Sequence, residues 1–124
     1  AGLPGGAADV DGVVAHGTAT TIGDTAEIRA INSLHRERDT TLRVASVKGH
    51  VGHTVSAAGA MNLMAALRSM EINAFAPTAG TTEVDPEAEF EVVTRRPSEG
   101  PVNVVQVNGF GFGGQNASLI VTRA

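Results

Sequence analysis

The sequence predicts an α/β fold in which helices cover a mixed β-sheet, with the element order βαβα followed by further β-strands. Two observations support this prediction. In the first half of the chain, apolar runs of strand length alternate with stretches whose apolar residues recur every three or four positions. In the second half, short apolar runs are separated by turn residues. With 124 residues, the chain can form one compact domain with a modest core.

The first half of the chain contains two predicted strand–helix pairs. Residues 10–15 (VDGVVA) form a short apolar run, which predicts a strand. Asp24 is the predicted N-cap of the helix that follows, because Glu27 stands at capping-box spacing and the helical periodicity continues to about His35. Residues 42–47 (LRVASV) alternate apolar and small side chains and predict the second strand.

A helix rich in small side chains is predicted at residues 54–72, where many alanines would allow close approach to a neighbour. Residues 73–88 contain Pro and Gly and are expected to form a loop. We therefore expect an N-terminal loop or connection over residues 1–9 and a single domain over residues 10–124. Three further strand candidates lie at residues 90–93, 102–107 and 117–121.

Composition excludes several classes of function. The net charge is −4 and no basic run is present, which argues against nucleic acid as a partner. No apolar stretch approaches the roughly 20 residues of a membrane-spanning helix, and the N-terminus does not resemble a signal peptide. The chain contains no cysteine, so it has neither a disulfide framework nor a thiolate nucleophile of its own. We expect a cytoplasmic protein.

Two motifs suggest functions that their context does not support. Residues 109–114 (GFGFGG) match the dinucleotide-binding pattern, but a strand-like segment follows where that motif needs a helix. A strained glycine turn that presents Phe110 and Phe112 at a cavity is the better interpretation. His50 and His53 have a spacing that zinc can use, but the other ligands of a zinc site are missing, so we expect no metal.

Histidines follow both of the first two predicted strands. His16 ends the first strand and precedes Gly17, while Lys48 and His53 follow the second strand at its junction with the next helix. Each histidine alone could equally be a core-edge residue whose ring is satisfied by backbone groups. Two of them at neighbouring strand ends predict a shared pocket. His35, beside Arg36 near a helix end, is predicted to be a solvated surface residue.

Three sequence blocks, in order, resemble those of β-ketoacyl synthases. Residues 16–27 read HGTATTIGDTAE, residues 46–59 read SVKGHVGHTVSAAG and residues 108–116 read NGFGFGGQN. The family patterns are H-G-T-x-T-x-x-G-D-x-x-E, S-x-K-x-x-x-G-H-x-x-x-A-A-G and N-x-F-G-F-G-G-x-N. Together the blocks reach across residues 16–116, and they resemble the C-terminal half of these enzymes.

The resemblance implies a fold and a set of catalytic residues. It implies the C-terminal half of a thiolase-like fold, with the nucleophilic Cys supplied by an N-terminal half that is absent from this chain. His16 and His53 match the paired histidines of the family, Lys48 matches its lysine, and Glu27 matches the acidic residue that typically pairs with that lysine. Two imidazole N–H donors at a thioester oxygen would stabilise an enolate by about 3 kcal/mol each.

The resemblance also implies substrate-binding positions. Thr18 and Thr20 match residues of the phosphopantetheine channel, and Phe110 and Phe112 match gating phenylalanines, with Phe112 the preferred gate. No cofactor is expected on the chain itself, because the substrate travels on the phosphopantetheine of acyl carrier protein. Ser56 replaces a usual Gly of the family, a departure that affects acyl specificity more than activity.

The implied activity is an acyltransferase reaction, the decarboxylative Claisen condensation of acyl thioesters with malonyl-acyl carrier protein in fatty-acid or type II polyketide biosynthesis. The implied partners are the N-terminal ketosynthase half and acyl carrier protein, in a homo- or heterodimer of the complete synthase. Because the chain ends soon after its last predicted strand, we expect a discrete subunit rather than a module of a larger synthase. The alternatives are a non-catalytic, chain-length-factor-like partner and an acyl carrier protein-binding module.

Overall fold

A mixed five-stranded sheet forms the centre of the fold in the computed structural model, which describes residues 3–124. The strand order is β4-β2-β1-β6-β7. The pairs β1–β2, β1–β6 and β2–β4 are parallel, and only the edge pair β6–β7 is antiparallel among these neighbours. The strands are β1 (Gly12–Val14), β2 (Arg43–Ala45), β4 (Glu91–Val92), β6 (Val104–Phe110) and β7 (Asn116–Thr122).

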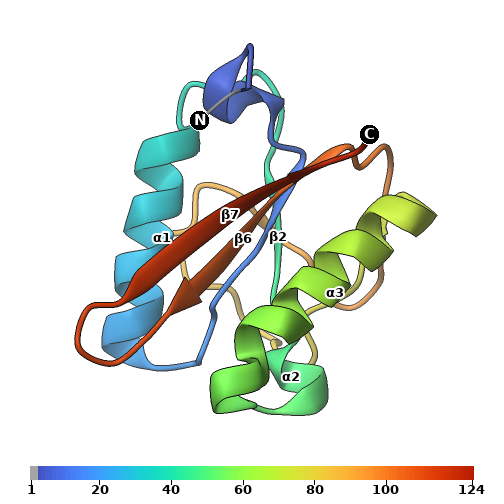
Figure 1. Cartoon of the computed structure of the whole chain (residues 1–124). Coiled ribbons are helices and arrows are strands. Elements are labelled where there is room, and N and C mark those ends of the chain that lie inside the picture. Colours follow the sequence, from blue (N-terminus) through green and yellow to red (C-terminus); the bar gives the residue numbers. More distant parts are fainter. Residues whose placement is uncertain (1–2) are drawn as a thin grey trace.

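Two long helices cover opposite faces of this sheet. Helix α1 (Thr21–His35) follows β1, and helix α3 (Ala58–Ile72) lies between β2 and β6 in the chain. Figure 1 shows them on either side of the strands. Alternation along β1 explains this arrangement, because Val13 belongs to the core cluster that contains Ile31 of α1, whereas Val14 belongs to the cluster that contains Ala66 of α3.

The start of α1 differs from the prediction. The helix begins at Thr21 with Thr20 as its N-cap residue, and the backbone N–H of Asp24 donates to the Thr20 carbonyl at 2.8 Å. Asp24 is therefore a residue of the first turn, where its charge is favourable for the helix dipole. The prediction of Asp24 as the N-cap was therefore wrong by one turn. Residues three positions apart, such as Asp24 and Glu27, also occur inside the first turns of a helix, so this spacing alone does not locate the N-cap.

Several short elements were not predicted. Residues 1–2 of the expected N-terminal loop lie outside the described residues, and Gly6–Asp9 form a 3-10 helix. The segment after β2 contains α2 (Lys48–Val51), and a 3-10 turn at Val55–Ala57 precedes α3. The strands β3 (Ala74–Phe75) and β5 (Ser98–Glu99) form a separate antiparallel ribbon. Elements of two to four residues are too short to show a hydrophobic period.

His35 is buried, which contradicts its prediction as a solvated surface residue. Its side chain lies at the last turn of α1 and is only 7% exposed. Its Nε2 atom is 3.1 Å from Oε1 of Gln106 on β6, and its Nδ1 atom is 3.3 Å from the Ala7 carbonyl oxygen. The neighbouring Arg36 suggested a polar surface, but the side chain of His35 points to the sheet.

Across the described residues, no helix is long and apolar enough to cross a membrane.

Candidate active site

The carboxyl ends of three parallel strands bring the predicted site residues to one edge of the sheet. The strands β1, β2 and β6 lie in a parallel register, so their carboxyl ends meet at the same edge. His16 follows β1 by two residues, Lys48 opens α2 just after β2, and Phe110 is the last residue of β6. His53 comes from the segment between α2 and α3. Strand topology therefore places His16, Lys48 and Phe110 together, and the segment after α2 brings His53 to them.

The two histidine rings lie in contact beside a phenylalanine. The ring centroids of His16 and His53 are 5.7 Å apart, with an interplanar angle of 87°. The His16 ring centroid is also 5.3 Å from that of Phe110. Both histidines line a cavity of about 210 Å³ together with Phe110 and Phe112. The shared pocket predicted from the two strand ends is present in the structure.

Backbone donors fix the tautomer of both imidazoles. The Phe110 N–H donates to Nδ1 of His16 at 3.3 Å, and the Val55 N–H donates to Nδ1 of His53 at 3.1 Å. A ring nitrogen that accepts a hydrogen bond carries no proton, so the proton of each neutral ring resides on Nε2. Val55 has a φ of 50°, an unfavourable value for a β-branched residue. Both rings are thus prepared to donate from Nε2.

The surroundings of His16 favour its neutral form. Burial lowers the pKa of His16 below its ordinary value, and the positive charge of Lys48 lowers the pKa further. Glu27 opposes this shift but does not reverse it. A neutral ring with Nδ1 occupied by a backbone N–H can act as a hydrogen-bond donor through Nε2 without being a cation.

Lys48 and Glu27 hold the backbone on either side of the His16 ring. The Lys48 ammonium donates to the His16 carbonyl oxygen. The two carboxylate oxygens of Glu27 accept the N–H groups of His16 and Gly17, each at 2.9 Å. Among the ion pairs of residues 3–124, none is between Lys48 and Glu27. The expected Lys48–Glu27 pairing is therefore wrong as a direct contact, because both groups bind the same short backbone segment instead.

The two candidate channel threonines have different environments. Thr18 lines a second cavity, of about 300 Å³, together with Lys48 and His53. Thr20 is the exposed N-cap residue of α1 and does not line that cavity. The hydroxyl oxygens of Thr18 and Thr20 are 3.1 Å apart. Thr18 therefore borders the candidate site directly, and Thr20 contacts it through Thr18.

Phe112 lies at the turn between β6 and β7 and is 97% exposed. The predicted strained glycine turn is present, since Gly113 and Gly114 have φ values of 83° and 84°. Gly111 has no such backbone conformation; a Cβ atom there would meet the Gln115 carbonyl oxygen at 3.3 Å. In this turn, the two glycines after Phe112 are thus the residues with positive φ. The Phe112 ring itself is exposed to solvent.

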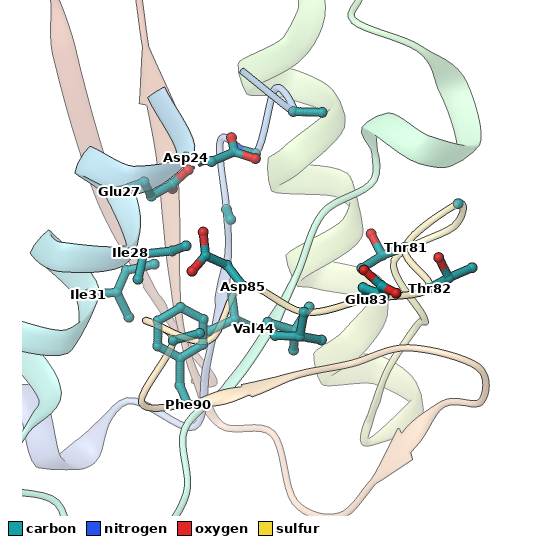
Figure 2. A pocket seen from close by; sticks show the side chains of 17 residues that line it. Asp24, Glu27, Ile28, Ile31, Val44, Thr81, Thr82, Glu83, Asp85 and Phe90 are labelled. Carbon is teal, nitrogen blue, oxygen red and sulfur yellow. Dashed lines mark hydrogen bonds between the residues drawn. The ribbon is translucent and has the colours of Figure 1, made fainter. Parts of the chain in front are cut away.

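A larger pocket of about 410 Å³ lies between α1, β2 and the segment 80–90. Figure 2 shows carboxylates of Asp24, Glu27 and Asp85 around it, with apolar side chains such as Phe90 beneath them. Burial raises the pKa of Asp24, whose Oδ1 atom has no hydrogen-bond partner. Neither histidine nor Lys48 lines this pocket.

In the described part of the chain, no group of three or more His, Cys, Asp or Glu side chains is arranged to hold a metal ion.

Sequence reasoning missed two buried amides beside the site. Gln106 and Asn108 lie on β6, and the Asn108 amide nitrogen donates to Oε1 of Glu27 at 3.0 Å. The available signal was the alternation in VVQVN, where two polar residues two positions apart interrupt an apolar strand and must share one face.

The family profile described as "Beta-ketoacyl synthase, C-terminal domain" matches residues 3–82. The chain belongs to the β-ketoacyl synthase family. Among its relatives, 3-oxoacyl-[acyl-carrier-protein] synthase 2 of Rhizobium meliloti is 35% identical over 117 residues, which cover 94% of this chain and 28% of the relative. The highly reducing polyketide synthase PKS6 of Gibberella zeae is 36% identical over 121 residues, which cover 92% of this chain and 5% of the relative.

Solved β-ketoacyl synthase structures have the same fold. A β-ketoacyl synthase from Burkholderia phymatum matches with a TM-score of 0.88 and 36% identity, covering 96% of this chain and 29% of the solved chain. The ishigamide ketosynthase/chain length factor matches with a TM-score of 0.85 and 35% identity, covering 93% of this chain and 28% of the solved chain. The expected C-terminal half of a thiolase-like fold is confirmed. The chain spans less than a third of the length of each of these relatives and solved chains.

Proposed function

We propose that this chain supplies the paired histidines of a condensing enzyme that performs decarboxylative Claisen condensation in fatty-acid or polyketide synthesis. One observation carries the proposal. His16 and His53 lie side by side, and each accepts a backbone N–H at Nδ1, so both offer an Nε2–H donor beside the same cavity. Two neutral donors suit a thioester oxygen that gains negative charge.

In the proposed reaction, a Cys of the N-terminal half carries the acyl group as a thioester. The malonyl group loses carbon dioxide when its carboxylate C–C bond breaks, and the electron pair forms an enolate. His16 and His53 donate to the enolate oxygen, a contribution of about 3 kcal/mol per donor. The enolate carbon then forms a bond to the acyl carbon, the C–S bond to Cys breaks, and the thiolate leaves. Lys48 and Glu27 keep the His16 backbone in place throughout.

The substrate thioester is proposed to arrive on the phosphopantetheine arm of acyl carrier protein. Thr18 borders a cavity that also contains Lys48 and His53, so its hydroxyl is available to an amide-rich arm near the histidines. Phe110 and Phe112 line the separate cavity of about 210 Å³ that both histidines border. Phe112, on its glycine-flanked turn, is the proposed gate for the acyl chain.

An N-terminal ketosynthase half is the proposed partner of the exposed face of α3. Ala60, Met64 and Leu67 follow one another at helical spacing on this face, and Met64 and Leu67 are 63% and 51% exposed. The edge strand β7 is also largely exposed, including Leu119 at 49%. An apolar stripe beside an open sheet edge favours burial against another polypeptide. The complete synthase is proposed to dimerise.

The alternative is a chain-length-factor-like subunit that does not condense. Removing the histidine side chains from the complete synthase distinguishes the two functions. With His16→Ala or His53→Ala, we expect condensation to be lost while acylation of the partner's Cys by a radiolabelled acyl donor persists. Equal condensation in wild type and both variants would refute the proposed role. Loss of Cys acylation in correctly folded variants would assign the histidines to an earlier step.

A further inference from the structure

A continuous row of buried polar side chains connects the candidate site to the far end of α1. Glu27 accepts from the Asn108 amide at 3.0 Å, the Asn108 Oδ1 accepts from the Gln106 amide at 2.9 Å, and Gln106 Oε1 lies 3.1 Å from Nε2 of His35. All four side chains belong to residues that are at most 7% exposed. Polar groups buried at this depth are costly unless every one is hydrogen-bonded.

Two sequence periods bring these residues into one row. Glu27 and His35 are eight positions apart on α1, so they share a face and are separated by about 12 Å along the helix axis. Ile31 lies between them and packs into the core. Gln106 and Asn108 are two positions apart on β6 and point to the same face of the sheet. The two amides therefore span the gap that Ile31 leaves between the carboxylate and the imidazole.

The direction of every hydrogen bond in the row follows from Glu27. An ionised carboxylate only accepts, so Asn108 must present its NH₂ group to Glu27 and its oxygen to Gln106. Gln106 must then present its NH₂ group to Asn108 and its oxygen to His35. An oxygen facing Nε2 requires His35 to carry a proton there. Rotating any one amide would set two acceptors or two donors against each other.

Other contacts of the row agree with this direction. The Ser118 hydroxyl donates to Asn108 Oδ1 at 3.0 Å, so that oxygen is an acceptor on two sides. The Ala7 carbonyl oxygen lies 3.3 Å from Nδ1 of His35 and also accepts from Arg38 at 3.0 Å. The oxygen of Gln106 requires a proton on Nε2 of His35, and this hydrogen bond completes the row. The row has one consistent arrangement, which is the property of a rigid support.

We propose that Gln106 and His35 are positioning residues for His16, acting through Asn108 and Glu27. Glu27 touches the N–H groups of His16 and Gly17, so its orientation determines where the His16 ring lies relative to His53. The orientation of Glu27 depends in turn on Asn108, and that of Asn108 on Gln106. The catalytic consequence rests on the function proposed above, whereas the structural coupling does not.

Nuclear magnetic resonance of the 124-residue chain tests the coupling without any activity measurement. In Gln106→Leu, the backbone amide protons of His16 and Gly17 are expected to move upfield, as they do when a hydrogen bond lengthens. The ring nitrogen shifts of His16 are expected to change with them. Val105→Ala is the matched control, because Val105 is a fully buried neighbour on the opposite face of β6. This control should leave the His16 and Gly17 signals in place.

Two further variants keep the test decisive if Gln106→Leu does not fold. Gln106→Glu retains the size of the side chain but cannot donate to Asn108 when ionised, so the same shifts are expected. His35→Leu removes the last donor, and His35→Gln restores an N–H near the Nε2 position, so the second variant should recover part of the wild-type spectrum. Unchanged His16 and Gly17 signals in the folded variants, or equal changes in Val105→Ala, would overturn the proposal.

Kinetics of the complete synthase separate this proposal from the function on which its catalytic part rests. Gln106→Leu is expected to lower kcat on the order of tenfold with KM little changed, because a displaced catalytic group loses orientation rather than substrate affinity. A wild-type synthase without condensation activity would refute the proposed function and leave the resonance result standing. Normal kcat in a Gln106→Leu synthase whose His16 signals have moved would show that the coupling exists but does not position the ring for catalysis.

Discussion

Lys48 and Glu27 bind the same residue from opposite ends, Lys48 at the carbonyl oxygen of His16 and Glu27 at its backbone N–H. The two charges therefore act through the backbone. Burial lowers the pKa of Lys48, while the charge of Glu27 raises it, so Glu27 partly offsets the cost of burying the Lys48 ammonium.

Replacing the Glu27 carboxylate tests this arrangement. Glu27→Gln changes one of two acceptor oxygens into a donor, which must face an N–H group of His16, Gly17 or Asn108. A buried group left unsatisfied in this way costs about 1–3 kcal/mol, measured as a lower free energy of unfolding in denaturant. Glu87→Gln, at the exposed ion pair with Arg29, is the control and should leave the free energy of unfolding nearly unchanged. Equal losses in both variants would contradict the buried role of Glu27.

The titration of His16 should occur below its ordinary range. The pKa of His16 in the folded chain lies below its ordinary value of 6.5, chiefly because of burial. The folded state thus prefers the neutral ring, and the associated stability is present above pH 6.5 and lost as the pH falls through the folded-state value. Resonance titration of His16 should give a midpoint below 6.5. A midpoint above this value would show that Glu27 outweighs burial and Lys48.

Charge variants should move this midpoint in opposite directions. Lys48→Met removes a positive charge that lowers the pKa of His16, so the midpoint should rise. Glu27→Gln removes a negative charge that raises the pKa, so the midpoint should fall further. A shift of the His16 midpoint in the same direction in both variants would indicate a structural change rather than an electrostatic one.

The fold class and the meeting of the two histidines were predictable from sequence. Apolar runs revealed the strands that carry His16 and Lys48, and parallel neighbours necessarily bring their carboxyl ends together. The sequence could not show that Lys48 would choose the His16 carbonyl over Glu27, because that choice depends on small differences in side-chain position. Burial of His35 was missed for a similar reason. Its charged neighbour Arg36 dominated the local pattern, and its partner Gln106 is 71 positions away.

Glycines near the end of β6 and in the turn after it should differ in their tolerance of substitution. Gly114 has a φ of 84°, where an L side chain is strained although the surrounding space is open. Gly114→Ala should therefore cost about 1–2 kcal/mol in unfolding free energy. Gly109 has no positive φ, and no atom lies within 4 Å of the point that a Cβ atom would occupy there. Gly109→Ala is thus the matched control and should change stability by less than about 0.5 kcal/mol. Equal losses of unfolding free energy in the two variants would show that available space, not backbone conformation, is what requires glycine at these positions.

The apolar stripe on α3 should govern association with the proposed N-terminal half. Met64→Glu and Leu67→Glu place charges on side chains that are 63% and 51% exposed, so the unfolding free energy of the chain alone should change by about 0.5 kcal/mol or less. A residue at the centre of an interface contributes about 2 kcal/mol or more to binding. Each variant should therefore weaken association with a separately expressed N-terminal half by more than about tenfold in calorimetric titration.

Ile22→Glu is the control for this experiment. Ile22 is 86% exposed and lies on α1, across the sheet from α3, so the same change of an apolar residue to a charged one should leave association intact. Weakening by Met64→Glu and Leu67→Glu alone would locate the partner on α3. Similar weakening by all three variants would mean that added negative charge, on a chain whose net charge is already −4, opposes association in general. Undiminished association in both α3 variants would require the N-terminal half to bind another surface, and the exposed edge of β7 would be the next to test.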